Sequence, residues 1–127
     1  MIIELQNIIP NALSQTRSPK SEIWGKKILL KRNDWIHILA PSGAGKSTLI
    51  GILYGTRKDF KGSLLFNHMH LERSRDWSQL RTNQLAIVFQ DLELLDDLTV
   101  LENIQLKNQL TGHFSDEKIF EMLTRLN

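Results

Sequence analysis

The sequence predicts an α/β fold in which an apolar strand runs into a glycine-rich loop and the loop runs into a helix. Residues 35–40 (W-I-H-I-L-A) are apolar apart from one histidine, and residues 41–45 contain two glycines. Residues 46–54 carry four large aliphatic side chains and are followed by Gly55, a common residue at helix C-termini. Strand-like and helix-like segments both continue after that point, so the pattern is that of a mixed fold.

The other strands are predicted from short apolar runs bounded by turn residues. They cover residues 2–8, 26–31, 62–66 and 85–89. Residues 35–40 form the central strand, because an almost continuous apolar run suits a strand covered on both faces. His37 within it is expected to be a hydrogen-bonded core residue. Residues 11–22 are polar and are predicted to form a loop, and residues 32–34 form a turn.

The helices are predicted from capping residues and apolar spacing. Residues 76–82 form a short helix, and Thr99 begins another one, with Glu102 completing a capping box. Ser115 begins the last helix, whose first turn is acidic. The expected apolar face of that helix consists of Ile119, Phe120, Leu123 and Leu126. The helix after the glycine-rich loop is expected to be buried over much of its girth by Leu49, Ile50, Ile52 and Leu53.

The composition excludes several classes of protein. The 127 residues are 41% hydrophobic and 24% charged, which is ordinary for a soluble globular domain. The absence of cysteine excludes disulfides and thiolate metal sites. A net charge of +2, evenly mixed, gives no basic stripe for nucleic acid. Neither a membrane-spanning run nor a signal peptide is evident, so the sequence predicts a cytoplasmic protein.

The glycine-rich loop has the composition of a phosphate-binding site. Gly43 and Gly45 allow the backbone to curl so that its N–H groups converge on one anion. The helix that follows adds the positive end of its dipole, Lys46 adds a full charge, and the Ser47 hydroxyl can ligate magnesium. The predicted nucleotide-binding residues are Pro41, Ser42, Gly43, Ala44, Gly45, Lys46, Ser47 and Thr48. The strict pattern begins with glycine where this chain has Ala40, and the alternative is a simple turn before a helix.

Beyond this loop, the sequence resembles the nucleotide-binding domain of ABC transporters. P-S-G-A-G-K-S-T-L-I-G-I-L-Y-G is similar to that family's Walker A loop and first helix, and residues 61–66 match the next strand. V-F-Q-D at 88–91, L-T-V at 98–100 and E-N-I at 102–104 resemble the family's Q-loop and following helix, especially in exporters of the lipoprotein-release and macrolide-efflux type. The resemblance implies a P-loop NTPase core with an antiparallel β subdomain, and it covers residues 1–127 as the N-terminal part of such a domain.

The resemblance also implies a set of roles and partners. Lys46 and Gln90 are the expected catalytic residues, Ser47 and Gln90 the expected contacts of Mg²⁺, and ATP the expected nucleotide. Residues after Gln90 would face a transmembrane permease subunit, and a complete domain would pair with a second nucleotide-binding domain. The protein would then lie on the inner face of the cell membrane, held there by its permease. The alternative for Gln90 is a residue that merely ends a buried strand.

The sequence departs from the family pattern at several places. Asn33 and Ala86 stand where glycines are usual, and residues 11–21 offer no aromatic for adenine, so that Trp24 is the nearest candidate and is expected to be a packing residue. The chain ends at Asn127, before the expected positions of the L-S-G-G-Q signature and the Walker B carboxylates. Residues 94–97 (L-L-D-D) imitate Walker B, but they are expected to be solvated turn residues.

Two further classes of protein compete with an ABC ATPase. A P-loop kinase or GTPase would need an acceptor site or a switch threonine, and the motif V-F-Q-D before L-T-V-L-E-N argues against it. A degenerate docking module without enzymatic activity is favoured slightly by Ala40 and by the missing aromatic. With the general base expected beyond this sequence, we expect the chain to bind ATP without efficient hydrolysis. His68 and His70 have no evident third ligand and are expected to form a surface pair.

Overall fold

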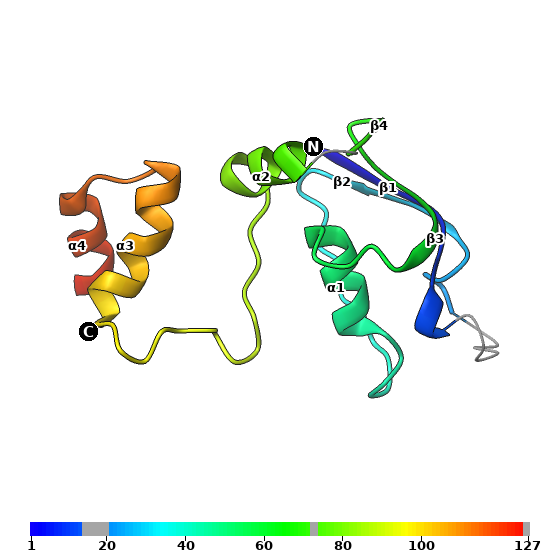
Figure 1. Ribbon diagram of the computed structural model, residues 1–127, viewed down its shortest axis with the longest axis horizontal. Helices are drawn as coiled ribbons and strands as arrows, with labels where there is room; N and C mark the ends of the chain where they lie inside the picture. Colours follow the sequence, from blue (N-terminus) through cyan, green and yellow to red (C-terminus); the bar gives the residue numbers. More distant parts are fainter. Residues whose placement is uncertain (14–20, 72–73, 126–127) are drawn as a thin grey trace. The chain divides into compact units, whose positions relative to one another are not determined.

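The computed structural model describes residues 1–13, 21–71 and 74–125 (Figure 1). It divides into two compact units, residues 1–86 and residues 87–127, and each unit is considered by itself. Part of the predicted loop 11–22 and the predicted apolar residue Leu126 lie outside the described residues. Within the described residues, no helix has both the length and the apolar character needed to cross a bilayer.

The first unit is built on a four-stranded antiparallel sheet with strand order β2-β1-β3-β4. Its strands are β1 (Ile2–Pro10), β2 (Lys27–Lys31), β3 (Phe60–Phe66) and β4 (Met69–His70), and a short 3-10 helix, η1 (Asn11–Leu13), follows β1. In β1, Ile3, Leu5 and Ile8 are buried, as the alternation of the first strand predicts. The antiparallel subdomain expected from the sequence is therefore present.

Two helices pack with this sheet around one core. Helix α1 (Lys46–Tyr54) has the predicted bounds, and α2 (Ser74–Asn83) is slightly longer than predicted. The core cluster combines residues of the sheet and both helices: Ile3, Leu5, Ile8, Leu49, Ile52, Leu64, Phe66, Trp77 and Leu80. Trp77 meets Phe66 edge to face, with ring centroids 5.4 Å apart. Helix α1 is less buried than expected, because Ile50 is 42% exposed.

The predictions of a central strand at residues 35–40 and of a further strand at residues 85–89 are wrong. Both runs are irregular, and neither is paired in the sheet that the described residues form. Trp35 is 99% exposed and Leu39 is 82% exposed, and His37, expected in the core, is exposed as well. An apolar run becomes a strand only when a neighbour completes its hydrogen-bond ladder, and the composition of the run does not supply that neighbour.

Asn33 takes a left-handed backbone conformation in the turn after β2, where no glycine is present. Its φ is 71°, a left-handed conformation that asparagine tolerates better than most residues. The turn is closed by a bond from the Asp34 backbone N–H to the Lys31 carbonyl, and Asp34 Oδ2 accepts from the Lys31 backbone N–H at 2.8 Å. The asparagine therefore takes a backbone conformation that is otherwise typical of glycine.

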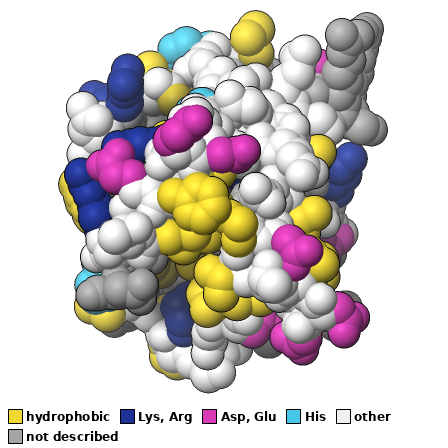
Figure 2. All heavy atoms as spheres, turned by 90° about the vertical axis from the view of Figure 1, so that its left-hand side faces the viewer, with side chains coloured by type: hydrophobic (Ala, Val, Ile, Leu, Met, Phe, Trp, Pro, Cys, Tyr) yellow, Lys and Arg dark blue, Asp and Glu magenta, His cyan; other side chains and the backbone are white. Residues whose placement is uncertain are grey.

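The second unit contains two helices, α3 (Val100–Thr111) and α4 (Asp116–Thr124). Thr99 and Glu102 form the predicted capping box, and the Ser115 hydroxyl accepts from the Lys118 backbone N–H. Of the expected apolar face of α4, Ile119 is buried, whereas Phe120 is 53% exposed. Figure 2 shows apolar side chains gathered on the face turned toward the viewer, with acidic side chains near them.

Candidate functional site

The glycine-rich loop is curled and accessible in the structure. Gly43 and Gly45 have φ values of 77° and 92°, which only glycine adopts without strain. The backbone N–H of Ala44 bonds to the Pro41 carbonyl at 3.3 Å, which closes a tight turn. Pro41 to Gly43 are exposed, as are Lys46 and Ser47. A ligand can therefore reach the loop from solvent.

The helix that follows the loop begins without a side-chain cap. Its N-cap residue is Gly45, in a left-handed conformation, and the described residues provide no side-chain cap at this end of the helix. The first N–H groups of a helix lack intrahelical acceptors and carry the positive end of the helix dipole. The helices α3 and α4, by contrast, are both capped by a hydroxyl. The start of α1 thus retains the donors that an anion needs.

The Lys46 side chain folds back over the loop. Its Nζ donates to the carbonyl oxygens of Ala40 at 2.6 Å and Pro41 at 2.9 Å. Both acceptors are neutral and the side chain is exposed, so an anionic ligand at the loop can compete with them for the ammonium group. The φ of Ala40 is not positive. Alanine in place of the first glycine of the pattern therefore introduces no backbone strain.

Trp24 supports the loop from the side of the sheet. Its indole N–H donates to the Ala44 carbonyl at 3.2 Å, and a Cβ built on Gly45 would lie 3.0 Å from its ring and 2.9 Å from Leu13 Cδ1. The half-buried Trp24 is a packing residue, as the sequence predicts, and it packs against the loop itself. Gly45 therefore meets two demands: a left-handed backbone and space for its neighbours.

A cavity of about 580 Å³ adjoins the same loop. Its lining includes residues of the segment 21–24, the irregular run 36–40, the loop, and Leu49 on α1. Apolar residues such as Ile28, Ile36 and Leu39 line it, and Lys46 is a basic residue of the same lining. The exposure of the irregular run and this cavity have the same origin, since residues 35–40 lack a neighbouring strand in the described part of the chain.

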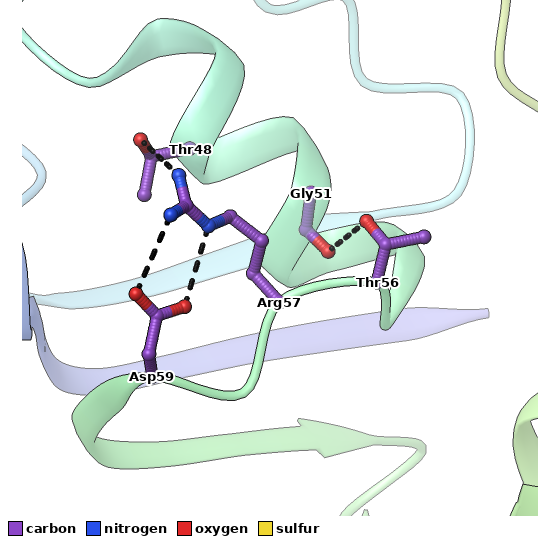
Figure 3. A network of polar contacts seen from close by, with 5 residues as sticks. All are labelled: Thr48, Gly51, Thr56, Arg57 and Asp59. Carbon is purple, nitrogen blue, oxygen red and sulfur yellow. Dashed lines mark hydrogen bonds and ion pairs between the residues drawn. The ribbon is translucent and has the colours of Figure 1, made fainter.

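Ser47 and Thr48 occupy the first turn of α1 in different surroundings. Ser47 is exposed and its hydroxyl is available to a ligand or a metal ion. The Thr48 hydroxyl accepts a hydrogen bond from Arg57 Nη1 at 3.3 Å (Figure 3). Arg57 could not be predicted from the sequence, because a contact between residues nine positions apart depends on how the chain returns after the helix.

Gln90 lies in the second unit, in a run of turns between the irregular segment 85–89 and α3. It is exposed and does not end a buried strand. Residues 94–97 are also exposed and lie in turns or irregular structure, which confirms that they are not a Walker B strand. Leu92 and Glu93 have positive φ values of 61° and 48°, so the backbone turns sharply directly after Gln90.

Asn103 fixes the end of this run of turns. Its side-chain amide donates to the carbonyl groups of Leu95, Leu98 and Thr99, each at 3.1 Å, and its oxygen accepts from the Leu95 backbone N–H at 2.9 Å. The Thr99 backbone N–H and hydroxyl both donate to Glu102 Oε2 at 2.7 Å. The adjacent Glu102 and Asn103 thus hold the start of α3 and the turn before it.

The histidines form no metal site among the described residues, where no group of three or more potential metal-binding side chains occurs. His68 contacts the Glu4 carboxylate through Nδ1 and lies in the turn between β3 and β4. His70 lies in β4 and is exposed. Both His68 and His70 therefore lie on the surface, as expected.

The described residues combine an antiparallel sheet with helices, and a glycine-rich loop lies directly before α1. The chain belongs to the ABC transporter family, whose family model matches residues 26–127. That match begins just before β2 and continues through both helices of the second unit. No match to a solved structure was found.

Several curated proteins are similar to this chain. The cell division ATP-binding protein FtsE of Bacillus subtilis is 34% identical over 89 residues, which cover 69% of this chain and 39% of that protein. The lipoprotein-releasing system ATP-binding protein LolD of Buchnera aphidicola is 36% identical over 132 aligned residues, which cover 95% of this chain and 58% of that protein. The bacitracin export ATP-binding protein BceA of Halalkalibacterium halodurans is 32% identical over 117 residues, which cover 87% of this chain and 46% of that protein. The chain thus spans about two-fifths to three-fifths of these relatives' lengths.

Proposed function

We propose that this chain binds ATP with Mg²⁺ through residues 41–48, as the ATP-binding part of an ABC transporter ATPase. The main support is the start of α1, where first-turn amides without a side-chain cap lie beside two left-handed glycines and the Lys46 ammonium group. Donors of this kind suit the adjacent negative charges of a polyphosphate. The names of the relatives FtsE, LolD and BceA as ATP-binding proteins support ATP as the nucleotide.

Each residue of the loop would contribute a distinct interaction. Lys46 exchanges its two carbonyl acceptors for oxygens of the terminal phosphates, which form stronger, charge-assisted hydrogen bonds. The exposed Ser47 hydroxyl serves as a ligand of Mg²⁺, and Thr48 donates to an inner phosphate. When bound, Mg²⁺ neutralises phosphate charge, and the protein contributes orientation and further positive charge.

We propose that Gln90 acts on the attacking water and the metal ion, and that this chain alone hydrolyses ATP inefficiently. An exposed side chain within a series of turns can reach toward a ligand. The 127 residues do not include the L-S-G-G-Q signature or a Walker B strand that supplies the general base. Binding and charge neutralisation would therefore occur without efficient activation of water.

We propose that the turns after Gln90 contact a transmembrane permease subunit. Leu92, Leu94 and Leu95 are between 53% and 60% exposed, and the Asn103 side chain holds the backbone of Leu95 in place. Apolar side chains on a fixed backbone suit docking of a partner helix. The complete protein would lie on the cytoplasmic face of the membrane and pair with a second nucleotide-binding domain. Its cargo and direction of transport are not specified by these residues.

A docking module without enzymatic activity has less support than an ATP-binding protein. Alanine at position 40 would favour a docking module if it distorted the phosphate-binding loop. The φ of Ala40 is not positive, so alanine causes no backbone strain there. Membership of the ABC transporter family likewise disfavours a P-loop kinase or GTPase.

Titration of fluorescently labelled ATP in the presence of Mg²⁺ tests ATP binding. The full chain is compared with Lys46→Ala and with Lys58→Ala, which removes the same charge from an exposed loop after α1. We expect Lys46→Ala to weaken binding about ten- to a hundredfold, as for loss of charge-assisted hydrogen bonds, and Lys58→Ala to bind like the unaltered chain. Failure of the unaltered chain to bind, or equal binding by Lys46→Ala, would overturn the proposal.

A further inference from the structure

Arg57 reaches from the loop after α1 back to the first turn of that helix (Figure 3). Its Nη1 lies 3.3 Å from Thr48 Oγ1. Its Nε and Nη2 donate to the two carboxylate oxygens of Asp59, at 3.3 Å and 3.5 Å. One edge of the guanidinium group, formed by Nε and Nη2, is thus held by one carboxylate, while Nη1 faces a residue in the first turn of α1.

Gly51 provides the path for the Arg57 side chain across the helix. A Cβ on Gly51 would lie 2.9 Å from Arg57 Cγ and 3.2 Å from Cδ, closer than side-chain atoms ordinarily approach. The contact involves the Cγ and Cδ atoms of the arginine stem and not the far end of the side chain. Glycine lowers helix stability in an interior position, and close passage of Arg57 is a structural reason for its presence here.

The start of the Arg57 side chain is fixed by the carbonyl of the same glycine. The Gly51 oxygen accepts from the backbone N–H groups of Thr56 at 2.9 Å and Arg57 at 3.1 Å, and from the Thr56 hydroxyl at 3.1 Å. The position from which Arg57 reaches back is therefore set by the end of α1, and its guanidinium group is set by Asp59.

The contact with Arg57 determines what the Thr48 hydroxyl can do. A threonine hydroxyl has one hydrogen and two acceptor lone pairs, and arginine has only donors. When Arg57 donates into one lone pair, the Thr48 hydrogen must point away from the guanidinium group, toward a different acceptor. Thr48 lies two residues after Lys46, in the turn whose amides have no side-chain cap.

We propose that Arg57 is a positioning residue for nucleotide binding, which orients the Thr48 hydroxyl so that its hydrogen is donated to an inner phosphate of the nucleotide. This inference rests on the proposed binding of ATP at residues 41–48. Arg57 is proposed to act through Thr48, because Asp59 holds its guanidinium group at Nε and Nη2 while Nη1 donates to the Thr48 hydroxyl. Asp59 in turn keeps the guanidinium group from moving onto the anion.

A double-mutant cycle on the full chain separates this role from a direct contact. Arg57→Met keeps an unbranched apolar stem over Gly51 and removes the donors, and Thr48→Val keeps the shape of threonine and removes the hydroxyl. We expect each single variant to weaken Mg²⁺–ATP binding about three- to tenfold, the range for one hydrogen bond. The double variant should bind no more weakly than Thr48→Val, because Arg57 has no further effect once the hydroxyl is gone.

Three further variants complete the test. Lys58→Met is the matched control, since it removes a neighbouring positive charge, and it should leave binding unchanged. Gly51→Ala displaces the Arg57 stem without altering Arg57, so it should weaken ATP binding even though alanine favours the helix. Arg57→Lys, which retains a donor, should recover part of the affinity. Thermal unfolding of every variant identifies any that do not fold, and Gly51→Ala then carries the test if Arg57→Met is unstable.

The outcomes distinguish this inference from the proposed function. If the unaltered chain binds ATP and Arg57→Met binds equally well, the positioning role is wrong and the ATP site stands. If the losses from Arg57→Met and Thr48→Val multiply in the double variant, Arg57 acts independently of Thr48 and the role is also wrong. Failure of the unaltered chain to bind ATP contradicts the proposed function itself.

Discussion

The Lys46 ammonium group lies 2.6 Å from the carbonyl oxygen of Ala40, the residue that replaces the first glycine of the phosphate-loop pattern. The contact joins the end of the irregular run 35–40 to the first residue of α1. It uses only the backbone of Ala40, so the methyl group of this residue plays no part in holding the lysine. The substitution of alanine for glycine is therefore compatible with a working loop.

Restoring the glycine should accordingly give no gain in nucleotide affinity. We predict that Ala40→Gly leaves ATP binding unchanged and destabilises the chain by about 0.5–1 kcal/mol, because glycine has more freedom in the unfolded state and Ala40 has no positive φ to relieve. Denaturant unfolding measures the stability, and ATP titration measures the affinity. A clear increase in affinity would mean that the alanine impairs the loop.

The two glycines of the loop should differ in their sensitivity to substitution. At Gly45, alanine must adopt a φ of 92° and its Cβ meets Leu13 and Trp24 at 2.9–3.0 Å, so we predict a loss of roughly 2–4 kcal/mol in the free energy of unfolding. At Gly43, φ is 77° but no atom lies within 4 Å of the added Cβ, so the loss should be roughly 1–2 kcal/mol. Denaturant unfolding of both variants compares the two losses. Equal losses would show that Leu13 and Trp24 do not confine Gly45.

Local features of this fold could be predicted from the sequence, and pairing over long distances could not. The bounds of α1 and the capping box of Thr99 and Glu102 depend on residues within one or two turns of each other, and both predictions are confirmed. The runs 35–40 and 85–89 have strand composition, but they have no paired neighbour among the described residues. The composition of a run indicates only that it suits a sheet, and its partners are set by the rest of the chain.

Only the contiguous part of the candidate site could be predicted from the sequence, because its other contacts join residues that are distant along the chain. Residues 41–48 are contiguous, so their glycines, lysine and hydroxyls could be recognised as a pattern. The contact of Arg57 with Thr48 and the support of Ala44 by Trp24 join residues 9 and 20 positions apart. Such contacts depend on how β1, β2 and α1 pack, and no local pattern encodes that packing.

The Asn103 side chain should govern the order of the turns that precede α3. We predict that Asn103→Ala speeds amide hydrogen exchange at Leu95 and loosens residues 95–99, because the hydrogen bonds between the side-chain amide and this backbone are lost. Asn108 provides a matched control on the same helix, since it holds Phe114 in the following loop through two bonds of the same kind. Asn108→Ala should leave Leu95 unaffected. Equal exchange at Leu95 in Asn103→Ala and the unaltered chain would argue against this clamp.

The capping box should make the start of α3 sensitive to acid. Hydrogen bonds from the Thr99 hydroxyl and backbone N–H lower the pKa of Glu102 below its ordinary value. Because the native pKa is lower than the unfolded one, the stabilisation is present above about pH 4.3 and is lost as the pH falls through the native pKa. We therefore predict that NMR titration gives Glu102 a lower midpoint in the unaltered chain than in Thr99→Ala, and that the first turn of α3 frays in parallel with protonation. Glu117 lies in the first turn of α4, and a hydrogen bond from the Ser115 side chain lowers its pKa. Its midpoint should stay low in Thr99→Ala, so it serves as the internal reference. Identical Glu102 midpoints in the two proteins would mean that the box does not form in solution.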